Sequence, residues 1–221
     1  MNFKFDKSFS EKISGYRLMA VEADVASPET DDSLWAEICM FARSFRECHE
    51  MPDVNRRPGI SATRLAYKIL GKEPNRYRPS TEALCRRFVK GLDLYRSLAI
   101  IDLVNLLSVM SGHAIGAFDI ERIDGDTLTL GVGREGEPYD AIGRGMLNIA
   151  CLPVFRDATG GIGTPTSDNE RTKITPQTRR LLLTINIYGQ DMPEAEIETL
   201  CRRLLEQYAS ADNKTFKIFQ P

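Results

Sequence analysis

The fold is decided by Asp102-Leu-Val-Asn105 and, after an apolar run, Ser111-Gly-His-Ala-Ile-Gly-Ala-Phe-Asp119. A second stretch of the same character follows in the C-terminal half: Ser167-Asp-Asn-Glu-Arg-Thr-Lys-Ile-Thr175, and then Arg179-Arg180. Each places polar residues in a turn between apolar runs. This layout is typical of a functional site that is carried on loops.

The composition is that of an ordinary soluble globular protein of one domain or a compact pair. No apolar run reaches the roughly 18 residues that a membrane span needs, and residues 1–7 lack a signal-peptide pattern. The five cysteines are scattered and none belongs to a CxxC pair, which indicates reduced thiols. We therefore expect a cytoplasmic protein with no membrane contact, no metal and no cofactor.

Basic residues concentrate between Asn55 and Lys90, although the net charge of the chain is −2. Ten lysines and arginines stand there against only Glu73 and Glu82. Such a region can bind a phosphate backbone. It can equally be a solvated helix face or pair with acidic segments elsewhere.

Several segments have the residue pattern of strands. Residues 16–25 partly alternate apolar and polar side chains, and residues 181–188 are rich in Leu and Ile. Asp124-Gly125 separates two further candidates, 118–123 and 127–132, and predicts a hairpin. Shorter strands are predicted at 139–142 and 152–155, and residues 160–166 are predicted to form a flexible surface loop.

Start and stop signals predict the helices. Ser27-Pro28 fits a helix start, and apolar side chains follow at helical spacing as far as Phe45. Gly71, Gly91 and Gly112 fit helix ends. Further helices are predicted at 61–70, 81–90, 98–110 and from Pro193 to Tyr208. This order predicts an α+β fold, with most helices in the N-terminal half and a mixed or antiparallel sheet behind them.

Three polar residues are candidates for chemistry. Glu170 can accept a hydrogen bond from a substrate hydroxyl or orient a water, or it can be a solvated residue that pairs with Arg171. Asn105 stands in an apolar helix, where an unpartnered buried amide costs roughly 1–3 kcal/mol, so it faces a pocket or ties a loop to the helix. His113 is either catalytic or a partner of the helix dipole.

These motifs resemble the B3/B4 domain of the phenylalanyl-tRNA synthetase beta subunit, in its free-standing form. That domain has an Asp-Val-Thr-Asn stretch, a Gly-x-Pro-x-His-Ala-Phe-Asp turn and a Gly-Gly-Glu-x-Ser-x-Val-Thr loop. Asp102–Asn105, Gly112–Asp119 and Asp168–Thr175 are similar to them in the same order. The resemblance is strongest over residues 15–190 of a single domain of 221 residues, with residues 191–221 expected to be a C-terminal helix and tail.

This chain departs from the family pattern at three places. Gly116 stands where the family has His, Val104 where it has Thr, and Asp168-Asn169 where it has Gly-Gly. The resemblance implies an α+β fold in which helices pack on a β-sandwich-like core. It also implies that this chain hydrolyses mischarged aminoacyl-tRNA in trans, at the 3′ aminoacyl end of the tRNA. An activated ester of this kind can be hydrolysed by an oriented water.

Two other functions stay open. One is a non-catalytic module that binds tRNA or an amino-acid-like ligand, and the other is hydrolysis of a small ester or amide unrelated to RNA. By the resemblance, Glu170 takes the place of a carboxylate that recognises or orients the aminoacyl group. The expected catalytic residues are Glu170 and His113, the expected substrate-binding residues are Asn105, Gly112, Gly116, Asp119, Arg171 and Thr172, and the expected tRNA-binding residues are Arg56, Arg57, Arg76, Arg78, Arg86 and Arg87.

Overall fold

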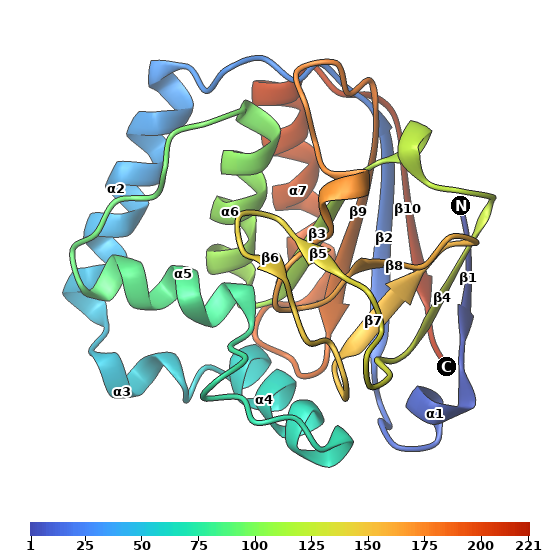
Figure 1. Cartoon of the computed structure of the whole chain (residues 1–221). Helices are drawn as coiled ribbons and strands as arrows, with labels where there is room; N and C mark the ends of the chain where they lie inside the picture. The colour runs from blue at the N-terminus through green and yellow to red at the C-terminus, as the bar shows by residue number, and fades with distance from the viewer.

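Two four-stranded sheets packed face to face form the centre of the structure, a computed structural model that describes residues 1–221 (Figure 1). The first sheet is antiparallel throughout and has the order β10-β2-β9-β3. The second has the order β1-β4-β7-β8, with β1 parallel to β4. The first consists of β2 (Arg17–Asp24), β3 (Ala114–Asp119), β9 (Arg180–Ile187) and β10 (Asp212–Phe219), and the second of β1 (Asn2–Phe5), β4 (Thr127–Val132), β7 (Pro153–Arg156) and β8 (Gly161–Gly163). A small ribbon of β5 (Asp140–Ala141) and β6 (Gly145–Met146) pairs with neither sheet.

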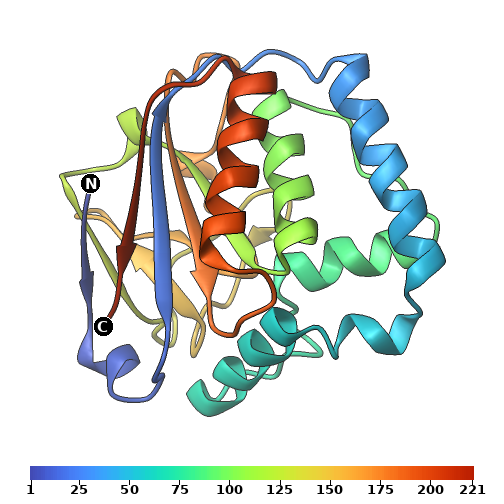
Figure 2. The same ribbon diagram turned by 180° about the vertical axis from the view of Figure 1, so that it is seen from behind.

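The four long helices lie on the side of the first sheet that points away from the second sheet, and the first of them packs mainly on the other helices rather than on the strands (Figure 2). They are α2 (Asp32–Cys48), α5 (Ser80–Val89), α6 (Ala99–Ser111) and α7 (Glu194–Ala209). The shorter helices are α1 (Lys7–Ser10), α3 (Met51–Val54) and α4 (Pro58–Leu70), and two 3₁₀ turns are η1 (Ile120–Arg122) and η2 (Glu170–Thr172). None of the helices is both long and apolar enough to cross a lipid bilayer. The expected α+β fold, a β-sandwich-like core with helices packed on it, is confirmed.

Strand β2 shows why the first sheet is apolar on both faces. Leu18 and Ala20 point into the core between the sheets, whereas Met19 and Val21 point into the core beneath the helices. Side chains alternate across a strand, so a strand buried on both sides has a nearly continuous apolar sequence. The predicted strands at 16–25 and 181–188 correspond to β2 and β9.

The helix predicted from Ser27-Pro28 begins later, at Asp32. Asp31 caps it, because its carboxylate accepts a hydrogen bond from the backbone N–H of Leu34 at 2.8 Å. Thr30 before it is tied to Ser97 through its backbone N–H. The predicted helix at 98–110 is α6, and it ends at Gly112, whose φ of 78° is the left-handed conformation that favours glycine.

The predicted hairpin around Asp124-Gly125 is wrong. Strand β3 pairs with β9 in the first sheet, whereas β4 pairs with β1 and β7 in the second. Asp119 redirects the chain between them, because its carboxylate accepts the N–H of Glu121 and caps the η1 turn. The segment therefore crosses from one sheet to the other.

Two further predictions are corrected. Residues 161–163, expected in a flexible surface loop, form the buried strand β8. Glycine permits this, because a side chain at Gly161 would collide with Tyr139 and one at Gly163 with Phe118. Residues 212–219, expected in a tail, form the edge strand β10, beside which β1 lies (Figure 1), with the rings of Phe3 and Phe219 4.8 Å apart.

Candidate functional site

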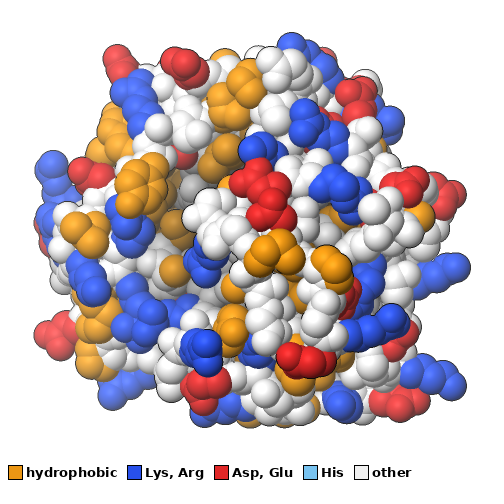
Figure 3. Space-filling view, viewed as in Figure 1, with side chains coloured by type: hydrophobic (Ala, Val, Ile, Leu, Met, Phe, Trp, Pro, Cys, Tyr) orange, Lys and Arg blue, Asp and Glu red, His pale blue; other side chains and the backbone are white.

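A cavity of about 470 Å³ opens between α6, the edge strand β3 and the loops around β5 and η2. Helix α6 contributes Ile101, Val104, Asn105 and Ser108, which lie on one helix face because their spacing is three and four residues. Strand β3 contributes alternate side chains, those of residues 115 and 117. A hollow bordered by apolar side chains is visible on this face, left of centre in Figure 3.

Asp168 places a carboxyl group in the wall of this cavity. Its Oδ2 accepts a hydrogen bond from the backbone N–H of Ala117 at 3.0 Å. Because β3 is an edge strand, this N–H points away from the sheet and is free to bind a loop residue. Burial raises the pKa of Asp168 to about 7, and the hydrogen bond from Ala117 only partly offsets the effect.

The space for this carboxyl depends on β8. A Cβ atom at Gly163 would lie 3.0 Å from Oδ1 of Asp168 and 2.4 Å from the ring of Phe118. Glycine at this position therefore lets the Asp168 loop lie close against the second sheet. The sequence suggested Asp168 only as a departure from the family pattern, since nothing local shows that an edge-strand N–H would hold it.

Asn105 faces the same cavity, as one of its two predicted alternatives required. Ser108, one turn further along α6, is bonded to the protein: its Oγ donates to the carbonyl of His113 and is 2.7 Å from Oγ1 of Thr81. Asp102 serves the frame of the site, because its Oδ2 accepts hydrogen bonds from Oγ1 of Thr30 and the N–H of Ser97. Of the polar groups on α6, the amide of Asn105 is thus the one presented to a ligand.

Two cations, Lys173 and Arg144, also line the cavity. Nζ of Lys173 is 2.5 Å from Oε2 of Glu170, and this contact lowers the pKa of Glu170. Glu170 is one third exposed and lies next to the cavity through Lys173 rather than in its wall. The expected alternative pair with Arg171 is not formed, because Arg171 makes two hydrogen bonds of 2.8 Å to Asp157.

His113 is fully buried and lies outside the cavity wall. Neither ring nitrogen has a hydrogen-bond partner, and burial lowers the pKa of the imidazole to about 4. A neutral ring cannot stabilise the helix dipole. Arg57 does so instead, by donating to the carbonyls of Val109 and Met110 at the end of α6.

The remaining expected substrate-binding residues also lie elsewhere. Gly112 is covered by the ion pair of Arg57 and Asp191, and Gly116 points between the sheets, where a Cβ would meet Phe118. Asp119 accepts a hydrogen bond from Thr178 at 2.8 Å, and Thr172 is buried. The structure therefore brings Asn105 into the cavity and Glu170 beside it, and does not bring the others there.

Several arginines of the basic region form ion pairs inside the protein. Glu82 is fully buried and lies 2.7 Å from Arg64, 2.9 Å from Arg86 and 3.6 Å from Arg78. Arg57 is only 12% exposed. The side chains that remain available to a ligand include Arg56 and Arg78, which are 78% and 49% exposed.

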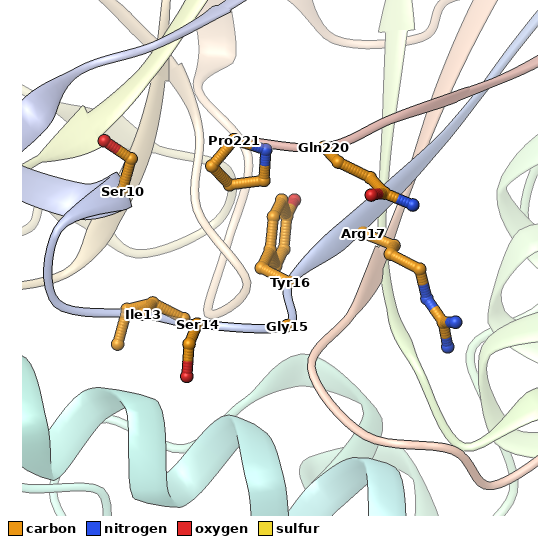
Figure 4. A pocket seen from close by; sticks show the side chains of 8 residues that line it. All are labelled: Ser10, Ile13, Ser14, Gly15, Tyr16, Arg17, Gln220 and Pro221. Atoms are coloured by element: carbon orange, nitrogen blue, oxygen red, sulfur yellow. The ribbon is translucent and has the colours of Figure 1, made fainter.

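A second hollow of about 350 Å³ lies near the C-terminus, around Tyr16, Arg17 and Pro221 (Figure 4). The hydroxyl of Tyr16 donates to Asn186, and Arg17 pairs with Glu194. Figure 4 shows that Arg17 extends away from Ser10 and Pro221. The polar groups around this hollow do not point toward a common centre. The cavity between α6 and β3 is therefore the better candidate for a functional site.

No group of three or more His, Cys, Asp or Glu side chains is arranged to hold a metal ion. A search of curated proteins returned no sequence match. Among solved structures, an N-terminal fragment of the phenylalanyl-tRNA synthetase beta subunit from Pyrococcus horikoshii is similar, with a TM-score of 0.49 and 10% sequence identity. The match covers 98% of this chain and 50% of that fragment, so the chain spans half the length of the fragment.

The family described as the B3/4 domain matches residues 62–199, which is more than half of the chain. This span contains α6, β3, β8 and the loop that carries Asp168 and Lys173. The chain therefore belongs to the B3/4 domain family.

Proposed function

We propose that the cavity binds the aminoacyl group of mischarged aminoacyl-tRNA and that the protein hydrolyses its ester in trans. This proposal rests on Asp168, which places a carboxyl group in the cavity wall. The pKa of this carboxyl group is about 7, so it can exchange protons near neutral pH. A volume of about 470 Å³ accommodates an amino acid together with part of a ribose. The reaction takes place in the cytoplasm, where aminoacyl-tRNA is made and used.

Ionised Asp168 accepts a proton from a water as its oxygen attacks the ester carbonyl. The C–O bond to the ribose then breaks, and the ribose oxygen takes the proton back from Asp168. The amide of Asn105 faces the same space and donates a hydrogen bond to the carbonyl oxygen as charge develops on it. The ester is already activated, so positioning of the water supplies much of the rate enhancement.

Apolar side chains set the character of the bound amino acid. Ile101, Val104, Ile115 and Ile174 line the cavity together with Leu84. These side chains favour an apolar amino-acid side chain by removing its surface from water.

Glu170 has two proposed roles at the mouth of this cavity. It recognises the aminoacyl group, as the family resemblance implies, or it holds Lys173 in position for a phosphate of the tRNA end. The short contact with Lys173 supports the second role. Glu170→Gln, in comparison with Lys173→Met, separates them: loss of Lys173 positioning predicts similar effects in both variants, whereas direct recognition predicts a larger effect at Glu170.

The test uses a panel of mischarged tRNAs and follows release of the amino acid. We expect one or a few of them to be hydrolysed, and Asp168→Asn to lower the rate by roughly 100-fold or more. Asp212→Asn is the matched control, because it makes the same chemical change at an exposed position on β10. If the wild-type protein binds tRNA in a salt-sensitive manner but releases no amino acid from any of them, the protein is a binding module and the proposal is wrong.

A further inference from the structure

Tyr95 is a large aromatic side chain that is 79% exposed and lines the mouth of the same cavity. It lies in the connection between α5 and α6. Exposed apolar side chains scattered singly are common, but an aromatic ring that borders a candidate site is a contact surface for a ligand. Ile142, which is 39% exposed, borders the same cavity.

The residues on both sides of Tyr95 are anchored through their side chains. Leu94 is buried in the core beneath the helices. Arg96 donates two hydrogen bonds to the carbonyl of Thr30, at 3.0 and 2.8 Å, and its guanidinium carbon lies 5.9 Å from the ring centroid of Trp35. Because its neighbours are fixed, Tyr95 is presented to solvent without the loop having to order itself when a ligand binds.

One face of the Tyr95 ring is occupied by a cation. The guanidinium carbon of Arg87 lies 4.6 Å from the ring centroid. Arg87 is held there because its Nε and Nη2 both donate to the carbonyl of Asp93. A tyrosine ring supported in this way from one side has its other face available for a flat partner.

We propose that Tyr95, supported by Arg87, stacks against the nucleobase at the 3′ end of the RNA whose aminoacyl group occupies the cavity. This inference rests on the proposed function. Aromatic side chains that stack bases beside basic groups are a general means of binding single-stranded nucleic acid. Here Lys173 and Arg144 supply the positive charge in the same cavity. Stacking tolerates any base, so this contact positions the RNA end without reading its sequence.

The probe is a short RNA with 2-aminopurine as its 3′-terminal base and an amino acid attached through a non-hydrolysable amide. Stacking on Tyr95 quenches the fluorescence of the base. We expect Tyr95→Ala to weaken binding by roughly 5- to 100-fold and Tyr95→Phe to retain it. Leu92→Ala is the matched control, because Leu92 is an exposed apolar residue of the same connection that does not line the cavity.

A second probe with an abasic 3′-terminal residue completes the test. The wild-type protein is expected to bind it about as weakly as Tyr95→Ala binds the 2-aminopurine probe, with no further loss in the variant. Equal loss with both probes would show that Tyr95 contacts something other than the base, for example the amino acid, and would overturn the inference. Unquenched 2-aminopurine with the wild-type protein would overturn it as well.

Failure of this inference can be told apart from failure of the proposed function. If stacking is absent and hydrolysis is real, the 2-aminopurine probe stays unquenched, while the wild-type protein still releases the amino acid from mischarged tRNA and Asp168→Asn does not. If hydrolysis is absent, no variant releases an amino acid, while the fluorescence of the non-hydrolysable probe still reports whether the base stacks.

Discussion

His113 has a neutral imidazole buried without a hydrogen-bond partner. Its pKa of about 4 in the folded protein is below the roughly 6.5 of an unfolded chain, so protonation favours unfolding. The stability that depends on this neutral ring is fully present above pH 6.5 and is lost as the pH falls towards 4. Protonation of His113 at acid pH is thus expected to destabilise the folded state.

We predict that His113→Gln reduces the acid sensitivity of the fold. Between pH 7.5 and 4.5 the wild-type free energy of unfolding should fall by roughly 2 kcal/mol more than that of the variant. Urea unfolding at the two pH values measures this difference. The variant His49→Gln, which removes the only other histidine, serves as control. The same pH dependence in wild type and His113→Gln would contradict the prediction.

Asp168 affects stability with the opposite sign. Its folded pKa of about 7 is above the roughly 3.9 of an unfolded aspartate, so the folded state binds the proton more tightly. Stability is therefore lost as the pH rises from about 4 through 7. We predict that Asp168→Asn is more stable than the wild type at pH 8, by about 2 kcal/mol after allowance for the water that reaches the cavity.

Thermal unfolding at pH 5 and pH 8 tests the prediction for Asp168. The asparagine keeps an oxygen that can accept the N–H of Ala117, so the geometry of the loop is preserved. A variant that is less stable than the wild type at pH 8 would show that the carboxylate is stabilised in the fold and that its pKa is not raised.

At the scale of elements, Glu82 holds α5 to its surroundings. Its carboxylate is fully buried among Arg64, Arg78 and Arg86. Glu82→Gln leaves these arginines without their negative partner, and we predict a loss of about 3 kcal/mol in the free energy of unfolding. Glu135→Gln, at an exposed position, should change it little. Equal urea midpoints for both variants would contradict the prediction.

Short-range sequence patterns correctly predicted several strands and helix ends. Strands β2 and β9 have apolar side chains on both faces, and Gly112 and Gly71 end α6 and α4. The hairpin failed because Asp124-Gly125 is a turn signal that carries no information on partners, and β3 finds its partner in β9, far along the chain. Strand β8 was missed because its glycines are selected by Tyr139 and Phe118, which are distant in sequence.

The candidate site was predicted in the same partial way. Asn105 was identified because an amide in an apolar helix needs a local reason, and it faces the cavity. The motif residues Asp102 and Asp119 proved to bind backbone and hydroxyl groups of the frame. Asp168 lies in the cavity wall because an edge strand holds it there, and Tyr95 borders the cavity because the connection between α5 and α6 places it there. Neither position can be read from the local sequence.

Across the whole molecule, some arginines of the basic region pair with buried groups and others are exposed to solvent. We predict that the double variant Arg56→Gln with Arg78→Gln weakens tRNA binding and lowers its salt slope by roughly 1 to 2. The loss of stability should be small, because Arg64 and Arg86 lie closer to the buried Glu82 carboxylate and still pair with it. Arg57→Gln should instead destabilise the fold, because it uncaps α6 and leaves Asp191 without its partner. Filter binding over a range of salt concentrations and urea unfolding measure the two effects. An unchanged salt slope in the double variant would show that Arg56 and Arg78 do not contact the phosphates of the tRNA.

In the proposed reaction, Asp168 is the proton acceptor in hydrolysis of an aminoacyl ester. The most direct measurement is the pH profile of kcat/KM for release of the amino acid from a mischarged tRNA, in the wild-type protein and in Asp168→Asn. The rate should rise with pH through about 7 in the wild type as the carboxyl ionises, and the variant should lose this rise together with most of the activity. An unchanged profile and rate in Asp168→Asn would show that Asp168 is not the proton acceptor.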